Sequence, residues 1–542
     1  MRGPSRAGVA LVVLASMSLA AMGGCGAPPR KAATAPRARG SLTIALVGRP
    51  ASIDPLKVSD ASGLALDSLC YDGLVRVGPD MTAAPDLARS WRISPDHLTY
   101  TFHLDPRARW QDGRPVTSQD VAFSLHAYMS PGNAAPAAAE LTDVAAVRTP
   151  NPRTVVVALR RPFAPFLLEG AALPVLPAHL LLAAGGGLSA SAAALLSAHP
   201  VGSGPFRLAA LSAQGARLEP NPGYFLGRPR LASLRVVFSP TAAAALGSLR
   251  RGEVDLAPVP GLDAPAVATW PGVHLRRTAA LQFAAIVYNV KYGPLASPAV
   301  RRALYFAVDR VRIVQAALGG YGAVADGPIP PSSWAYDAAL GHRAYDPARA
   351  LAILSSLGWH ETHGVLRDPQ GRPLRLTILA DAAVPSRSVT VGLAVRGLEA
   401  IGVQVAVRDE PFARYAEDFA SGDFEAAFVE RGLTPDPDVA AYFGSSAVNT
   451  SGQNAGFYAD KAVDAALAAE RDATGTAARR RAFAALQAAL ATDPPALFLY
   501  FPDDVYAVGP SFGGFTPDAA GIFWNSQDWR GQVHAHGTGK ES

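Results

Sequence analysis

The 542-residue sequence predicts an α/β protein built from several packing units. Apolar segments with strand character alternate with segments of helical spacing along most of the chain, an order typical of α/β layers. The length exceeds what one hydrophobic core usually serves and indicates about three units. Hydrophobic residues make up 49% and charged residues 17% of the chain, which is the composition of a globular body.

Six segments carry the clearest strand signals. Leu98, Tyr100, Phe102 and Leu104 alternate with polar residues, the period of two that a half-buried strand shows. Shorter apolar runs predict further strands over residues 42–47, 374–380, 403–407, 424–429 and 496–501.

Three helix starts can be recognised from their caps. Thr117 and Asp120 resemble a capping box and predict a short helix. Ser297-Pro298 and Asp346-Pro347 each combine an N-cap residue with a first-turn proline. Apolar positions 300, 304, 307, 308 and 311 predict one helix after the first of these pairs, and Gly358 is expected to end the helix after the second.

Residues 1–24 have the pattern of a signal peptide. A cationic start precedes an apolar run from Val9 to Ala21, which is too short for a membrane span. The run ends in Met22-Gly23-Gly24-Cys25, which resembles a bacterial lipobox, so Cys25 is the predicted lipidation site. Residues 25–39 then predict a flexible tether held by the lipid. Cleavage nearby without lipidation is the alternative.

The net charge of +5 originates in this N-terminal region. No acidic residue precedes Gly40, whereas six basic residues do: Arg2, Arg6, Arg30, Lys31, Arg37 and Arg39. Subtracting these six charges from +5 leaves −1 for residues 40–542. A body without net positive charge does not favour contacts with phosphate backbones, so we do not expect nucleic-acid binding.

An ordered series of motifs carries the strongest functional signal. It comprises Pro85-Asp86-Leu87-Ala88, Ser90-Trp91, residues 99–104, Trp110-Gln111-Asp112-Gly113 through Thr117, Asp120-Val121-Ala122-Phe123-Ser124, and later residues 200–206, 252–255 and 301–310. The series resembles family 5 extracytoplasmic solute-binding proteins, which are the peptide- and nickel-binding subunits of ABC importers. The resemblance covers residues 40–508.

The resemblance implies a two-lobed periplasmic-binding-protein fold of the large class, with an extra subdomain and a hinge between the lobes. By analogy, residues 40–74, 199–285 and 501–542 form lobe I, residues 75–198 form its subdomain, and residues 286–500 form lobe II. A solute would be captured between lobes that close around it. The expected partners are this solute, an ABC permease with its ATPase subunits, and the membrane that holds the lipid. We expect an extracytoplasmic monomer that hydrolyses no ATP itself, since the sequence contains no P-loop motif.

Candidate ligand contacts follow from the same resemblance. They lie after the first strand, at two lobe crossovers and in the loop 430–438: Ser52, Tyr288, Asn289, Tyr500, Glu430, Arg431, Thr434 and Asp436. In peptide-binding members, an aspartate four residues before a proline of this loop pairs with the peptide ammonium. Alignment on Pro437 places Leu433 at that position.

The usual peptide anchor is therefore missing, and an apolar side chain cannot compensate a buried ammonium. Glu430, Asp436 or Asp438 could substitute, Arg431 could pair with an anionic group, or the loop could be solvated without touching ligand. Peptide is the first expected ligand. A sugar oligomer, an opine-like conjugate and a metal chelate are alternatives.

One enzyme motif opposes the transport interpretation. Gly509-Pro510-Ser511-Phe512-Gly513 matches G-x-S-x-G, and residues 505–508 could form the strand that this motif needs. The following residues do not predict a helix, and only 31 residues remain after Ser511 to supply the acid and the histidine. We expect no catalytic residue, no metal site and no cofactor. An extracytoplasmic serine hydrolase using Ser511 and a signalling receptor of the same fold are the alternatives.

Overall fold

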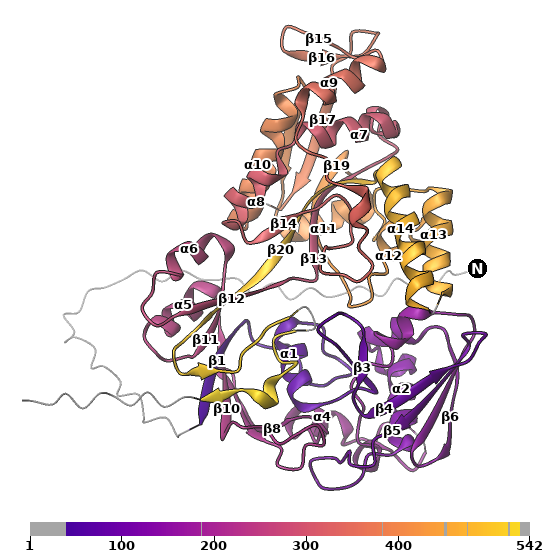
Figure 1. The fold of residues 1–542 in the computed structure, drawn as a ribbon, viewed down its shortest axis with the longest axis vertical. Helices are drawn as coiled ribbons and strands as arrows, with labels where there is room; N and C mark the ends of the chain where they lie inside the picture. Colours follow the sequence, from indigo (N-terminus) through magenta and orange to yellow (C-terminus); the bar gives the residue numbers. More distant parts are fainter. Residues whose placement is uncertain are drawn as a thin grey trace, which may run out of the picture. The chain divides into compact units, whose positions relative to one another are not determined.

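The computed structural model describes residues 40–531, apart from 186, 382, 449–452, 474 and 519–520. The expected signal peptide, Cys25, the tether and the chain beyond residue 531 lie outside the described residues. The described chain is a mixed α/β fold (Figure 1). None of the helices in these ranges has the length and hydropathy of a membrane-spanning segment.

Twelve of the described strands form one sheet, in the order β18-β17-β19-β13-β20-β11-β1-β10-β9-β8, with β12 and β14 also paired to β20. The lobe I part contains β1 (Ser41–Val47), β8 (Phe206–Leu211), β9 (Gly215–Pro220), β10 (Ser233–Ser239), β11 (Leu256–Val259) and β12 (His274–Ala279). The lobe II part contains β13 (Gln282–Tyr288), β14 (Gly322–Val324), β17 (Arg375–Ala380), β18 (Gln404–Asp409) and β19 (Ala426–Gly432). The strands expected over residues 42–47, 374–380, 403–407 and 424–429 are confirmed.

One strand, β20 (Ala496–Val508), belongs to both parts of the sheet. Up to Pro502 it pairs with β13 and β14, and from Asp503 onward it pairs with β11 and β12. The sequence predicted strands over residues 496–501 and 505–508 without joining them. The backbone stays extended between them because the Pro502 carbonyl accepts a hydrogen bond from Ala280 N–H (3.0 Å) and Asp503 N–H donates to the Tyr321 carbonyl (3.1 Å).

A separate antiparallel sheet, in the order β4-β5-β7-β6, forms the core of the expected subdomain. Its strands are β4 (Ala88–Ile93), β5 (Thr99–Leu104), β6 (Val144–Asn151) and β7 (Thr154–Leu159). Tyr100, Phe102 and Leu104 are buried, as the alternation on β5 predicted. Helix α2 (Ser118–Met129) packs on β6 and β7, and the Asp120 carboxylate accepts a hydrogen bond from Thr117 N–H at 2.8 Å, as a capping box requires.

The remaining helices and strands complete the two lobes, and helices cover the sheet of lobe II (Figure 1). In lobe I and its subdomain these are α1 (Ala61–Cys70), β2 (Val75–Val77), β3 (Ala83–Pro85), α3 (Ala178–Leu181), α4 (Ala192–Ala198), α5 (Ala242–Arg250), α6 (Ala264–Val267), β21 (Phe512–Gly513) and β22 (Arg530–Gly531). In lobe II they are α7 (Pro298–Ala307), α8 (Arg310–Leu318), α9 (Pro347–Ser356), β15 (His360–Thr362), β16 (Val365–Arg367), α10 (Pro385–Glu399), α11 (Phe412–Ser421), α12 (Ala440–Phe443), α13 (Lys461–Asp472) and α14 (Thr476–Thr492). The residue boundaries expected for the lobes stay a prediction.

The prediction of a single helix reaching Val311 is wrong. Helix α7 ends at Ala307, because Val308 has an extended backbone (φ −111°, ψ 120°). The Asp309 carboxylate then accepts a hydrogen bond from Arg312 N–H at 2.9 Å and starts the separate helix α8. Val311 is 62% exposed on this second helix, so it does not extend the apolar face of α7.

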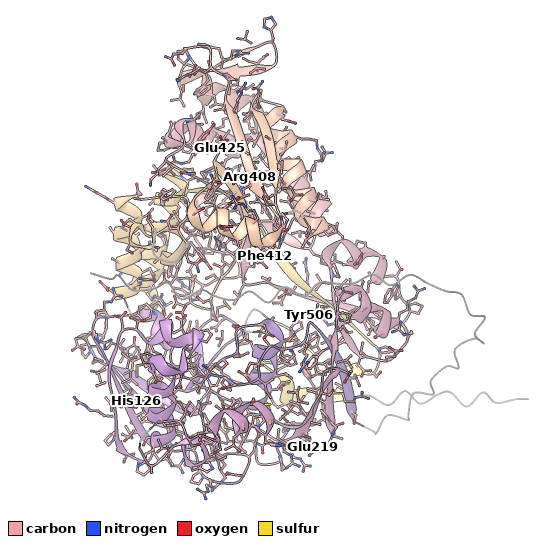
Figure 2. The ribbon with its side chains drawn as sticks, turned by 180° about the vertical axis from the view of Figure 1, so that it is seen from behind. His126, Glu219, Arg408, Phe412, Glu425 and Tyr506 are labelled. Carbon is pink, nitrogen blue, oxygen red and sulfur yellow. The ribbon has the colours of Figure 1, made fainter. Side chains whose placement is uncertain are left out.

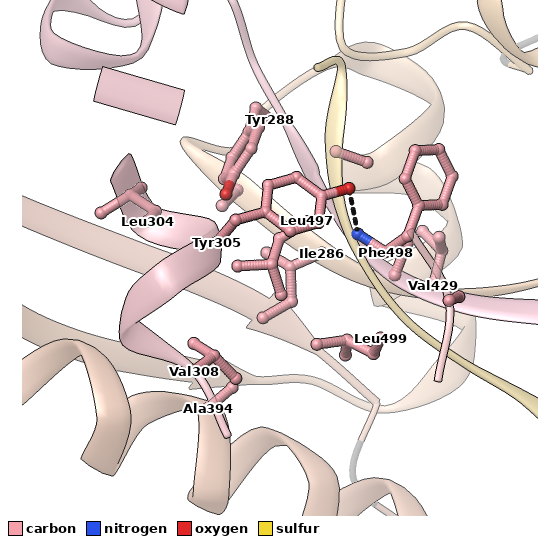
Figure 3. Packing of buried hydrophobic residues seen from close by; sticks show 14 of the residues in the cluster. Ile286, Tyr288, Leu304, Tyr305, Val308, Ala394, Val429, Leu497, Phe498 and Leu499 are labelled. Carbon is pink, nitrogen blue, oxygen red and sulfur yellow. Dashed lines mark hydrogen bonds between the residues drawn. The ribbon is translucent and has the colours of Figure 1, made fainter. Parts of the chain in front are cut away.

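In the core of lobe II, a buried polar contact joins helix α7 to the shared strand (Figure 3). The hydroxyl of Tyr305 on α7 accepts a hydrogen bond from the backbone N–H of Phe498 on β20 at 3.0 Å. Both side chains are fully buried among apolar neighbours such as Ile286 and Leu497. The contact fixes α7 against the strand that continues into lobe I.

Replacing Tyr305 with phenylalanine tests this contact. Tyr305→Phe should lower the free energy of unfolding by about 1–3 kcal/mol, since the buried N–H of Phe498 loses an acceptor. Urea unfolding followed by circular dichroism measures the change. Tyr345→Phe, at a tyrosine that is 47% exposed, is the matched control and should change stability little. Equal stability of both variants would contradict the role of the Tyr305 hydroxyl.

Candidate functional site

A cavity of about 790 Å³ is lined by residues from both lobes. Lobe I contributes α1 and β2, the crossing segments contribute Thr278, Leu281 and Tyr506, and lobe II contributes Pro435 from the loop after β19. Figure 2 shows Tyr506 on the part of β20 that runs into lobe I. Small-molecule pockets usually have volumes of roughly 300–1,000 Å³. The cavity therefore has the size and position of a site for a small solute.

The wall of this cavity in lobe I depends on a close backbone approach at the end of α1. A Cβ atom at Gly202 would lie 1.8 Å from the carbonyl oxygen of Cys70, so only glycine fits there. The approach lets Ser203 reach the next residue of the wall, and its hydroxyl accepts a hydrogen bond from the N–H of Asp72 at 3.2 Å. The motif at residues 200–206 thus fixes the chain between α1 and β2.

The charges that line the cavity are mostly negative. Among the described lining residues the charged side chains are one arginine and five aspartates: Arg76, Asp67, Asp72, Asp86, Asp504 and Asp518. Burial raises the pKa of Asp72 to about 6, partly offset by hydrogen bonds to Ser203 and Tyr224. Burial, and then the neighbouring Asp72 carboxylate, raise the pKa of Asp86 well above its usual value.

Asp67 lies on the side of the cavity formed by α1. Burial raises its pKa, and the charges of Asp54 and Asp60 raise it further. Asp504 lies on β20, and its side chain is exposed because it faces the cavity. The protein atoms around it still displace water from the carboxylate, which is the main cause that raises its pKa.

Aromatic rings form much of the remaining wall. The described aromatic lining residues are Tyr71, Tyr128, Tyr224, Tyr506, Phe523 and Trp524. The ring of Tyr506 is held edge-on against Phe515 with centroids 5.7 Å apart, and the indole N–H of Trp524 donates to the Thr516 carbonyl at 2.6 Å. The site thus combines flat apolar surfaces with a few charged groups, as ligand pockets commonly do.

The candidate contacts at the lobe crossovers lie elsewhere. Tyr288 and Tyr500 are at most 1% exposed in the lobe II core, and the Tyr500 hydroxyl is 3.4 Å from the Thr390 hydroxyl. The Asn289 amide donates to the Gly422 and Phe424 carbonyls, at 3.3 and 2.9 Å.

Ser52 also has a local partner, because its hydroxyl accepts a hydrogen bond from Asp54 N–H at 3.0 Å. All eight predicted contacts are described, and none of them lines the 790 Å³ cavity. Their roles in ligand binding stay predictions.

Glu430 and Arg431 in the expected ligand loop are engaged with neighbouring side chains. The Glu430 carboxylate accepts a hydrogen bond from Arg387 Nε at 2.8 Å. The guanidinium of Arg431 lies 4.6 Å from the ring centroid of Phe419 and 5.6 Å from that of Tyr442. Burial lowers the pKa of Arg431, which is the direction expected for a cation without a carboxylate partner.

Asp436 is fully buried and tied to Arg479. Its two oxygens accept hydrogen bonds from both terminal nitrogens of that guanidinium, at 2.6 and 2.7 Å. Arg479 also donates to Glu470 at 2.8 Å, and burial raises the pKa of Glu470 to about 8. Thr434 Oγ1 donates to the Asp436 carbonyl at 2.5 Å, while Leu433 packs against the lobe II core. This network orders the loop.

Ser511 has a structural partner and lacks the backbone context of a hydrolase nucleophile. Its hydroxyl donates to the Asp255 carboxylate at 3.1 Å, and the second oxygen of Asp255 accepts from Thr43 N–H at 2.8 Å. Phe512 and Gly513 form the short strand β21 where the motif requires a helix. Ser511 therefore connects the C-terminal segment to β1.

The comparisons with known proteins agree with the fold and the position of the cavity. The family described as bacterial extracellular solute-binding proteins, family 5 Middle, matches residues 82–454. This chain belongs to that family.

Three relatives illustrate the match. The oligopeptide-binding protein AppA of Bacillus subtilis is 24% identical over 512 residues, covering 92% of this chain and 93% of AppA. NikZ from Campylobacter jejuni, solved in complex with Ni(L-His), is 27% identical with a TM-score of 0.74, covering 91% of this chain and all of NikZ. The binding protein AgaA from A. tumefaciens R10, solved with agropinic acid, is 26% identical with a TM-score of 0.70, covering 92% of this chain and all of AgaA.

Membership settles the functional class. Family 5 solute-binding proteins are extracytoplasmic, non-enzymatic components of transport, so the expected two-lobed fold and the absence of an enzymatic activity are both confirmed by the family. The serine hydrolase alternative is excluded on the same ground.

Sequence reasoning missed the acidic wall of the cavity. Asp86 stands inside one of the motifs that carried the resemblance, but the motif alone does not say where its side chain points. Asp67 and Asp72 follow apolar residues near the end of a helix and carry no local signal of a site. Only the approach of α1, β2 and β3 brings the three carboxylates to one cavity.

The Asp436–Arg479 pair generates a stability prediction. Asp436→Asn should lower the free energy of unfolding by about 3 kcal/mol, because it leaves a buried guanidinium with one fewer carboxylate partner. Urea unfolding of the full chain measures the loss, with the exposed Asp263→Asn as the matched control. A variant as stable as the control would contradict the structural role of Asp436.

Proposed function

We propose that this protein captures a small solute in the cavity between its lobes and delivers it to the permease of an ABC importer. The observation that supports this most strongly is the 790 Å³ cavity lined by α1 and β2 on one side and by Pro435 on the other. A solute that touches both lobes stabilises the closed arrangement relative to the open one, and this difference in affinity drives closure.

The shared strand β20 is the element about which the lobes would move. Its partners change between Pro502 and Asp503, so the backbone at this point belongs to neither lobe alone. A second contact between the lobes lies at the end of α13, where the Arg471 guanidinium is 5.8 Å from the Phe163 ring centroid. Closure would make or break this contact while β20 stays continuous.

The ligand is proposed at the level of a small polar solute, with peptide as the first candidate. AppA is named as an oligopeptide-binding protein, NikZ was solved with Ni(L-His), and AgaA was solved with agropinic acid. Chains similar to this one therefore accommodate several chemical classes of solute. Leu433 stands where peptide-binding members have an aspartate, which weakens the case for their mode of peptide binding. Denaturing the purified protein and identifying the released solute by mass spectrometry would test the assignment.

Ligand-induced closure gives a prediction that needs only that released solute. The radius of gyration from small-angle scattering should fall on addition of the solute, because the lobes close around it. The free energy of unfolding should rise by about 2.7 kcal/mol at a free concentration one hundred times the dissociation constant. Unchanged scattering at saturation would contradict capture by closure. Loss of the gene without loss of solute uptake would contradict delivery and would favour the signalling alternative.

We also propose that the mature chain is a lipoprotein held at the membrane through Cys25. A Cys25→Ala variant should lose its acyl groups and leave the membrane fraction, because residues 25–39 then no longer connect the body to a lipid. Metabolic acyl labelling and fractionation measure both effects, and Cys70→Ala, at a buried cysteine of the body, is the matched control. Acyl labelling that persists in Cys25→Ala would contradict the assignment.

A further inference from the structure

We propose that the part of the cavity between α1, β2 and β3 binds a positively charged group of the solute through Asp67, Asp72 and Asp86. This inference rests on the proposed capture function and names the class of solute. The solute carries an amino or guanidino cation, and this cation is held by lobe I.

The first argument is that each carboxylate is buried and incompletely paired. Asp67 is 3% exposed, and Asp72 and Asp86 are each 6% exposed. One oxygen of each has no hydrogen-bond partner among the described residues: Oδ2 of Asp67, Oδ2 of Asp72 and Oδ1 of Asp86. A buried polar atom without a partner costs free energy, which a ligand that supplies the missing donor recovers. All three residues belong to the wall of the same cavity.

The second argument is the charge balance of the cavity. Arg76 is the one cation among the described lining residues, and it forms no ion pair with a described residue. Its charge lowers the pKa of both Asp72 and Asp86, yet burial keeps both values raised. The protein thus supplies too little positive charge for its own carboxylates. A cationic solute compensates this deficit, whereas an anionic solute would increase it.

The third argument is that the Asp72 carboxylate is held in place and that aromatic rings line the same wall. The Tyr224 hydroxyl donates to Oδ1 of Asp72 at 3.0 Å and so fixes that side chain, with Oδ2 left for a ligand. Tyr71 is 4% exposed, and its hydroxyl also has no partner among the described residues. Aromatic faces beside carboxylates suit an organic cation.

The wall that contains Asp67, Asp72 and Asp86 is poorly suited to binding a bare metal ion. Within the described residues no three histidine, cysteine or carboxylate side chains are close enough together to hold a metal. The three aspartates therefore do not form one compact cluster, although Asp72 and Asp86 are neighbours. An organic cation with several N–H donors can bridge such separated oxygens.

The test uses pairs of small probes that have similar shapes and differ in charge. Putrescine, agmatine and choline are compared with 1,4-butanediol and 3,3-dimethylbutan-1-ol as neutral partners and with succinate as an anion. Calorimetry and thermal shift on the full chain should show binding of at least one cation, with its neutral partner at least tenfold weaker. Asp72→Asn and Asp86→Asn should each weaken the cation at least tenfold.

Two further variants separate charge recognition from damage to the fold. Arg76→Gln should strengthen binding of the cation several-fold, because it removes the competing positive charge, and a merely structural defect would not produce a gain. Asp263→Asn, at an exposed aspartate outside the cavity, should leave the affinity unchanged. Circular dichroism confirms that each variant is folded.

The outcomes distinguish this inference from the proposed function. Failure of every cation to bind at millimolar concentration, or binding of a neutral partner within twofold of its cation, overturns the inference. A neutral or anionic solute that binds equally to the wild type, Asp72→Asn and Asp86→Asn also overturns it, while leaving capture between the lobes intact. Capture itself is contradicted by a different result, namely that the solute released from the purified protein fails to rebind.

Discussion

The continuity of β20 is the constraint on which the rest of this structure depends. A strand that pairs with β13 and β14 at one end and with β11 and β12 at the other makes the two parts of the sheet share a single backbone. The contact between the Tyr305 hydroxyl and Phe498 N–H anchors the lobe II end of this strand to a helix. With both ends fixed in packed cores, movement between the lobes is concentrated where the pairing changes, between Pro502 and Asp503.

Buried charges in this protein fall into two groups with opposite consequences. Asp436 has both oxygens bound by Arg479, so its burial is compensated within the chain and leaves nothing for a ligand. Asp72 and Asp86 are buried to a similar degree, but each keeps an oxygen without a partner at the cavity wall. Since an isolated buried charge costs far more than a paired one, the same residue type stabilises the fold in one place and favours a ligand in the other.

Local patterns in the sequence were sufficient for much of the fold. The alternation on β5 and the cap of α2 each depend on neighbours within a few residues, and the structure has both. The end of α7 was missed because Val308 continues an apolar spacing while Asp309 is able to start a new helix, and spacing alone does not decide between them. The continuity of β20 across Pro502 was missed because it depends on hydrogen bonds with Ala280 and Tyr321, which are distant in sequence.

The candidate site was less predictable, for a physical reason. Resemblance directed attention to the loop 430–438, where the family's peptide anchor would lie, and this chain has Leu433 there. A cleft closed from both sides can hold a charged group from either lobe, so an anchor lost from lobe II does not remove the capacity to select by charge. Carboxylates in lobe I, brought together by the end of α1 and the strands that follow, would supply the negative charge that is missing at Leu433. Selectivity for a cation would then be set where the chain has its acidic wall, while the loop after β19 contributes shape through Pro435.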